Sequence, residues 1–142
     1  MGLISGAHTV GVAHCSFFSD RLYNFQGIGA ADPSMDPNLV ASLKNVCPSP
    51  TSSSTVQDPT VFLDQNTSFS FDNSYYQQLQ LNHGILQIDQ ELNSAGSTKG
   101  IVTSLASDGT TFSKSFASAM IKMGDIRVLT GKKGEIRTIA EL

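Results

Sequence analysis

The sequence has no tryptophan, only two cysteines and few charges, and each shortage narrows what the protein can be. Charged residues make up 15% of the 142 residues and the formal net charge is −3, so no basic surface indicates a nucleic-acid partner. No apolar run is long enough to span a bilayer. No charged and then apolar leader precedes a cleavage site, so we expect no signal peptide within this sequence. The length predicts one domain, or one half of a larger one.

The two cysteines, Cys15 and Cys47, permit one disulfide without requiring it. A bond between them would close a loop of 32 residues, which the chain-entropy model credits with roughly 3–4 kcal/mol of stabilisation. Two buried free thiols in a reducing compartment are the alternative. A zinc site made from His8, His14 and the two cysteines is a weaker hypothesis, because neither C-x-x-C nor H-x₃-H spacing is present.

Local patterns predict short helices joined by loops. Asp36 followed by Pro37 is typical of a helix start, and Asp108 precedes the most regular pattern, a helix expected over residues 110–123. Shorter helices are expected over residues 15–23, from Asp72 to just before Gly84, over residues 90–93, and after Ser97. Residues 49–59 are rich in Ser, Thr and Pro and predict an exposed loop. These patterns predict an all-α, helix-and-loop architecture.

The segment Ser5-Gly6-Ala7-His8-Thr9-Val10-Gly11 places one imidazole among small residues. Small residues let a planar group approach the backbone closely. An imidazole can ligate a metal through one nitrogen and form a hydrogen bond through the other. A lone structural histidine is the alternative interpretation, and it is the more common one for a pattern of this kind.

A second cluster, Asp64-x-x-Thr67-x-x-Ser70-x-Asp72, brings two carboxylates and two hydroxyls together within nine residues. Ca²⁺ takes about six to eight oxygen ligands, so this set suits it, although the spacing is not that of an EF-hand. A solvated loop followed by a helix cap is the alternative. Asn66-Thr67-Ser68 also matches a glycosylation acceptor, which competes with the metal hypothesis because an acceptor is exposed and a Thr ligand is buried.

Together these segments make the chain resemble the C-terminal half of a plant secretory (class III) haem peroxidase. Besides the His8 segment and Cys15, the matching stretches follow in family order: Asp20-Arg21-Leu22-Tyr23-Asn24-Phe25, Phe71-Asp72-Asn73-Ser74-Tyr75-Tyr76, Gly84-Ile85-Leu86, Asp89-Gln90-Glu91-Leu92 and Gly134-Glu135-Ile136-Arg137. The resemblance implies that residues 1–142 form the proximal portion of the all-α peroxidase fold, without the distal portion.

The resemblance also implies roles for individual residues. His8 matches the axial ligand of the iron in haem b, and Asp89 matches the carboxylate that accepts a hydrogen bond from its other nitrogen. Phe17 matches an aromatic side chain at the haem edge, with plain core as its alternative. The proximal Ca²⁺ site corresponds to Thr9, Asp64, Thr67, Ser70 and Asp72, and a family disulfide corresponds to Cys15 and Cys47.

The implied activity is the H₂O₂-dependent oxidation of small phenolic donors, with roles in hydrogen peroxide removal and the response to oxidative stress. The implied protein is mostly monomeric, is secreted or vacuolar, and has no nucleic-acid or membrane partner. The distal His and Arg that cleave the peroxide bond have no match here, so we expect the isolated chain to be inactive. A non-enzymatic remnant that binds Ca²⁺ or haem is the alternative.

Overall fold

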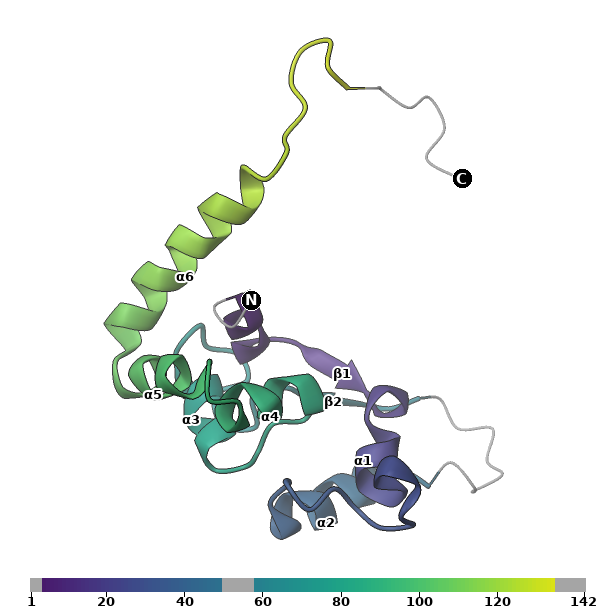
Figure 1. Ribbon diagram of the computed structural model, residues 1–142. Helices are drawn as coiled ribbons and strands as arrows, with labels where there is room; N and C mark the ends of the chain where they lie inside the picture. Colours follow the sequence, from purple (N-terminus) through teal and green to yellow (C-terminus); the bar gives the residue numbers. More distant parts are fainter. Residues whose placement is uncertain (1–3, 50–57, 135–142) are drawn as a thin grey trace.

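The computed structural model describes residues 4–49 and 58–134, and these are mostly helical (Figure 1), which confirms the predicted fold class. In chain order the elements are η1 (Ile4–Thr9), β1 (Val12–His14), η2 (Cys15–Phe17), α1 (Ser19–Tyr23), η3 (Phe25–Gly27), α2 (Pro37–Val46), β2 (Thr60–Phe62), α3 (Ser74–Gln80), α4 (Gln87–Ser94), α5 (Lys99–Ser107) and α6 (Gly109–Gly124). No helix among the described residues is long and apolar enough to cross a membrane. The loop expected at 49–59 falls mostly outside the described residues.

Side-chain caps define the two helices that the sequence predicts best. Asp36 Oδ1 accepts hydrogen bonds from the backbone N–H groups of Asn38 and Leu39, which begins α2. Asp108 Oδ1 accepts from Thr110 N and begins α6. Both predicted starts are confirmed. The rest of α6 is less buried than its apolar pattern suggests, because only its first turns pack against other described elements.

The structure contains a short antiparallel pair of strands, β1 and β2. The sequence patterns predict helices and loops but no strands. Ala13 lies opposite Val61 and both are buried, whereas the residues on either side of each are exposed. Three residues are too few to establish a period of two in the sequence. The pair matters for the site because it brings residues 60–64 beside the segment that follows His8.

The buried apolar side chains form two clusters. The first joins β1, β2, α1 and α2 and contains a disulfide between Cys15 and Cys47, as the resemblance implied. The bond excludes both the free-thiol and the zinc interpretations. The second cluster joins α3, α5 and the start of α6 around Tyr75, Tyr76, Leu79, Val102, Leu105, Ala106 and Phe112. In Figure 1, α1 and α2 lie to one side of the strands, α3, α4 and α5 lie to the other, and α6 extends away.

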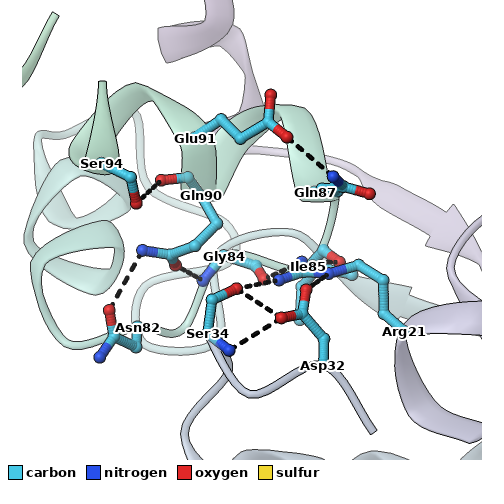
Figure 2. A network of polar contacts seen from close by, with 10 residues as sticks. All are labelled: Arg21, Asp32, Ser34, Asn82, Gly84, Ile85, Gln87, Gln90, Glu91 and Ser94. Atoms are coloured by element: carbon cyan, nitrogen blue, oxygen red, sulfur yellow. Dashed lines mark hydrogen bonds and ion pairs between the residues drawn. The ribbon is translucent and has the colours of Figure 1, made fainter. Parts of the chain in front are cut away.

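A buried guanidinium connects α1 to the segment between α3 and α4. Arg21 is only 1% exposed, and its Nε donates to Asp32 Oδ2 at 2.8 Å. Its Nη1 donates to the carbonyl oxygens of Gly84 and Ile85 at 2.7 and 2.8 Å (Figure 2). Burial by itself raises the pKa of Asp32, but hydrogen bonds from Ser34 and the Arg21 charge outweigh it, so the pKa lies below its ordinary value.

Gln90 completes this network from the first half of α4. Its Nε2 donates to Leu79 O at 3.0 Å. Its Oε1 accepts from Gly84 N at 3.0 Å (Figure 2). A Cβ at position 84 would lie 2.9 Å from Gln90 Oε1, so glycine is needed here for close approach. The expectation that Gly84 ends the preceding helix is wrong: α3 ends at Gln80, and Asn82 takes the left-handed conformation with φ 63°.

The helix expected over residues 15–23 is also different in the structure. It is divided into η2 and α1 at Phe18, whose φ is −139°. Phe18 is fully buried in the first cluster, so the break in the helix places its ring in the core. Tertiary packing therefore overrides the weak helical pattern of this stretch.

Replacing Arg21 by Met tests the buried network. We expect a loss of about 3–5 kcal/mol of folding stability, because Asp32 would become a buried charge without its partner and two carbonyl oxygens would lose their donors. Urea unfolding followed by circular dichroism measures the change in a chain without tryptophan. Lys114→Met on the exposed face of α6 is the control and should change stability by no more than about 0.5 kcal/mol. Equal effects of the two substitutions would contradict the assigned role of Arg21.

Candidate functional site

The small residues before His8 serve the packing of the chain on itself. A Cβ at Gly6 would lie 2.8 Å from both Phe112 Cε2 and Tyr76 Oη, so only glycine lets η1 approach α3 and α6 this closely. Thr9 is fully buried on the same turn, whereas the side chain of His8 is 34% exposed. One side of η1 therefore packs against α3 and α6, whereas the His8 side chain lies on the more exposed side.

His8 is paired with a carboxylate from the far end of the chain. His8 Nδ1 and Asp89 Oδ2 lie 2.9 Å apart, and Asp89, in the first turn of α4, is only 2% exposed. The hydrogen bond with Asp89 raises the pKa of His8, burial opposes this effect, and the charge of Asp89 adds to it. A carboxylate at Nδ1 favours the tautomer that carries its proton there, which leaves the lone pair of Nε2 available to a metal.

An open pocket of about 530 Å³ adjoins His8. Its walls come from η1, β1, η2, the residue after β2 and the start of α4. They are formed by His8, Val12, Ala13, His14, Phe17, Leu63, Leu86, Gln87 and Ile88. Most of these side chains are apolar, so the pocket suits a largely apolar ligand with a group that an imidazole can hold. Phe17 is 73% exposed at this pocket, so the alternative that it belongs to the core is wrong.

The five residues of the predicted Ca²⁺ site lie together beside η1. Thr9 Oγ1 donates to Asp72 O at 2.8 Å and lies 3.4 Å from Ser70 O. Thr67 Oγ1 lies 3.0 Å from Asp72 Oδ1 and 3.3 Å from Asp64 Oδ2. Hydroxyl, carbonyl and carboxylate oxygens from 64 residues of chain thus meet within hydrogen-bonding distance. This is the donor chemistry that Ca²⁺ prefers.

The charge balance of this cluster also suits a cation. Asp64 is fully buried, and among the described residues it accepts hydrogen bonds from hydroxyl and backbone groups alone, including Asn66 N and Ser74 Oγ. Among the described residues, no basic side chain forms an ion pair with Asp64 or Asp72. A buried carboxylate without a positive partner is costly, and a divalent cation would remove that cost.

The glycosylation motif does not conflict with this cluster. Asn66 is exposed, whereas the hydroxyl of Thr67 lies against the two carboxylates. The two residues nevertheless belong to one network, because Asn66 Nδ2 donates to Ser74 Oγ at 3.3 Å and Ser74 Oγ donates to Asp64 Oδ1 at 3.2 Å.

Two features that support the His8 site were not predicted from the sequence. One is the buried pair of Arg21 and Asp32, and the other is the contact of Tyr75 with His8. Tyr75 packs edge-on against the His8 ring, with the ring centroids 6.0 Å apart. Tyr75 is buried in the second cluster together with Leu79, and nothing in the local sequence indicates its contact with His8. For Arg21, which follows Asp20 in a segment of mixed polar and apolar residues, the local sequence carries no signal of burial.

Comparison with known proteins agrees with this geometry. The family model described as Peroxidase matches residues 1–108. The chain belongs to the peroxidase family. It is 51% identical to Peroxidase 44 of Arabidopsis thaliana over 95% of this chain and 39% of that protein. It is 47% identical to Peroxidase 57 of Arabidopsis thaliana, over 93% and 40% of the two chains. Its identity to Peroxidase 15 of Ipomoea batatas is 44%, over 95% and 41%.

The resemblance to plant peroxidases is thus confirmed over nearly the whole chain. The chain spans about two fifths of the length of these peroxidases, as the coverage of 39–41% shows. The matched residues 1–108 contain the His8–Asp89 pair, the walls of the pocket and the whole oxygen cluster. The candidate site therefore lies inside the part of the chain that carries the family match.

Replacing Asp89 by Asn should lower the pKa of His8, because the hydrogen bond to an anion that raises it is lost while the burial that lowers it remains. In the wild-type chain the folded-state pKa of His8 lies above the ordinary histidine value of 6.5. The pair therefore contributes its full stability below that pH and loses it as the pH rises through the folded-state pKa. NMR of the histidine rings against pH measures the change, and His14 and His83 provide internal references. An unchanged His8 curve would contradict the pairing.

Proposed function

We propose that this chain supplies the proximal portion of a haem peroxidase, with His8 as the axial ligand of the iron in haem b. The observation that carries the proposal is the pairing of His8 Nδ1 with Asp89 at 2.9 Å beside an apolar pocket. The pairing leaves Nε2 for the iron, and the pocket walls suit a flat apolar ring. Phe17, exposed at the same pocket, is proposed to lie at the haem edge.

A bound haem would supply two-electron reduction of H₂O₂ and one-electron oxidation of donors. The contribution of the chain is electrostatic and positional. Asp89 accepts the Nδ1 proton of His8 in a hydrogen bond, which makes the imidazole a stronger electron donor at Nε2. The burial of Asp89 in the first turn of α4 keeps the carboxylate away from water and strengthens this effect.

We further propose that Thr9, Asp64, Thr67, Ser70 and Asp72 bind Ca²⁺, with Ser70 contributing its carbonyl oxygen. Thr9 is covalently bonded to His8, so a cation held by Thr9 and the two carboxylates would fix the position of the imidazole. The cluster and the His8–Asp89 pair would then act as one unit, in which metal binding stabilises the geometry of the axial ligand.

The remaining steps of the reaction need groups outside this unit. We propose that the distal His and Arg that activate peroxide belong to the part of the relatives that has no counterpart here, and that the chain alone does not turn over H₂O₂.

The proposed donors of the whole enzyme are small phenols, and the proposed roles are peroxide removal and the response to oxidative stress. The proposed location is extracellular or vacuolar, and the disulfide supports an oxidising compartment. The proposed protein is a monomer.

A non-enzymatic role is the second candidate, and the oxygen cluster is the observation that favours it. The cluster is formed within the described residues without any contribution from a haem. In this case the chain would bind Ca²⁺, or Ca²⁺ and haem, without catalysis.

Calcium should raise the thermal unfolding midpoint of the chain. At a concentration a hundredfold above the dissociation constant, a ligand that binds only the folded state adds about 2.7 kcal/mol. Asp64→Asn should lose most of this gain. Asp125→Asn is the control, because Asp125 is exposed and follows α6, and it should retain the gain. Mg²⁺ should give a smaller gain, because it demands near-octahedral geometry and dehydrates reluctantly. A wild-type midpoint that Ca²⁺ does not move would overturn the proposed metal site.

Haemin added to the Ca²⁺-loaded chain should produce a Soret band that depends on His8. His8→Ala should abolish this band, and free imidazole should restore part of it by occupying the place of the lost ligand. His83→Gln, at a histidine outside the pocket, should retain it. Turnover of H₂O₂ with a simple phenol should not exceed that of free haemin.

The Soret band and the turnover test different parts of the proposal. Fast phenol oxidation that requires His8 would contradict the proposed inactivity of the chain. The absence of a His8-dependent band, together with a calcium shift, would favour the non-enzymatic role.

A further inference from the structure

Two polar atoms in the interior lack a hydrogen-bond partner among the described residues, namely Tyr75 Oη and Asp89 Oδ1. Both residues are almost fully buried, with exposures of 1% and 2%. Buried polar groups in native proteins are nearly always paired, and an unpaired carboxylate oxygen is especially unfavourable. Two such atoms at one site therefore indicate an interaction between them.

The surroundings of the two atoms place them together. Asp89 holds His8 through its other oxygen, Oδ2, and the Tyr75 ring packs edge-on against the His8 ring. Tyr75 is in the first turn of α3 and Asp89 is in the first turn of α4, two helices in direct contact. Burial raises the pKa of Tyr75, and the nearby charge of Asp89 raises it further, so the phenol keeps its proton.

We propose that the hydroxyl of Tyr75 donates a hydrogen bond to Asp89 Oδ1 and that Tyr75 is a positioning residue for His8. The proposal rests on the proposed function in one respect, that His8 binds the iron. Tyr75 would hold the carboxylate in the orientation that directs Oδ2 at His8. It would also withdraw part of the carboxylate charge and so set how strongly Asp89 polarises the imidazole.

The neighbouring tyrosine has a different role. Tyr76 interacts through its hydroxyl with the backbone of Gly6, on the turn that carries His8. The two consecutive tyrosines of α3 therefore support His8 from two directions. Tyr76 contacts its backbone segment, and Tyr75 acts on the carboxylate that orients its ring.

A double-mutant cycle tests the pair in the full chain without haem. Tyr75→Phe should lower the urea midpoint in the wild-type background and should lower it much less in Asp89→Leu, where no carboxylate is left to accept the bond. Tyr23→Phe is the matched control, because the Tyr23 hydroxyl donates to Cys47 O at 2.6 Å, away from Asp89. It should lower the midpoint equally in both backgrounds. If Asp89→Leu does not fold, Asp89→Ala takes its place. Equal effects of Tyr75→Phe in both backgrounds would overturn the proposal.

The iron–histidine stretch of the ferrous haem-loaded chain, measured by resonance Raman spectroscopy, tests the positioning role. Tyr75→Phe should raise this frequency, because Asp89 without its second donor becomes a stronger acceptor for His8. Tyr23→Phe should leave the frequency unchanged, as expected for a substitution that affects stability alone. An unchanged or lowered frequency in Tyr75→Phe would overturn the positioning role. If the wild-type chain binds no haem, the proposed function fails, and the double-mutant cycle alone decides whether Tyr75 and Asp89 are paired.

Discussion

The buried guanidinium of Arg21 is the contact on which the geometry of the site depends. His8 and Asp89 are 81 residues apart in sequence, so their separation of 2.9 Å requires that α4 be held in place relative to the first part of the chain. Arg21 provides this constraint by binding Asp32 and the carbonyl oxygens of Gly84 and Ile85, just before α4. Gln90 strengthens it from within α4. A polar network in the interior thus fixes where the first turn of α4 begins.

The structure buries three carboxylates, Asp32, Asp64 and Asp89. The neighbours of each one determine whether it has a structural role or can act at a site. Asp32 faces a guanidinium and is structural. Asp89 faces the imidazole of His8, so its charge acts on a group that can bind a metal. Within the part of the chain that the structure describes, Asp64 has hydroxyl and backbone donors around it and no basic side chain, which leaves a negative charge for a cation to neutralise. The family resemblance implied the roles of Asp89 and Asp64 from the sequence, whereas the buried pairing of Asp32 with Arg21 was not predicted.

Predictions from the sequence succeeded where the stabilising interaction lies within a few residues, and failed where it joins segments far apart in the chain. The starts of α2 and α6 were predicted correctly, because Asp36 and Asp108 cap backbone groups only two or three residues away. The strands were missed because each has three residues and is stabilised by its partner rather than by its own pattern. Gly84 was assigned to a helix end because its close contact with Gln90 is not visible in the local sequence.

The sequence by itself determined the helical class, the main caps, the family resemblance and the residue types of both candidate sites, since these depend on spacing within short segments. Only the tertiary structure decided that Cys15 and Cys47 are bonded, that Phe17 is exposed, and that Tyr75 shares the interior with Asp89. It also showed that Thr9 meets Ser70 and Asp72 across more than 60 residues of chain. The physical reason is that burial and charge pairing arise between segments far apart in sequence, where local periodicity carries no information.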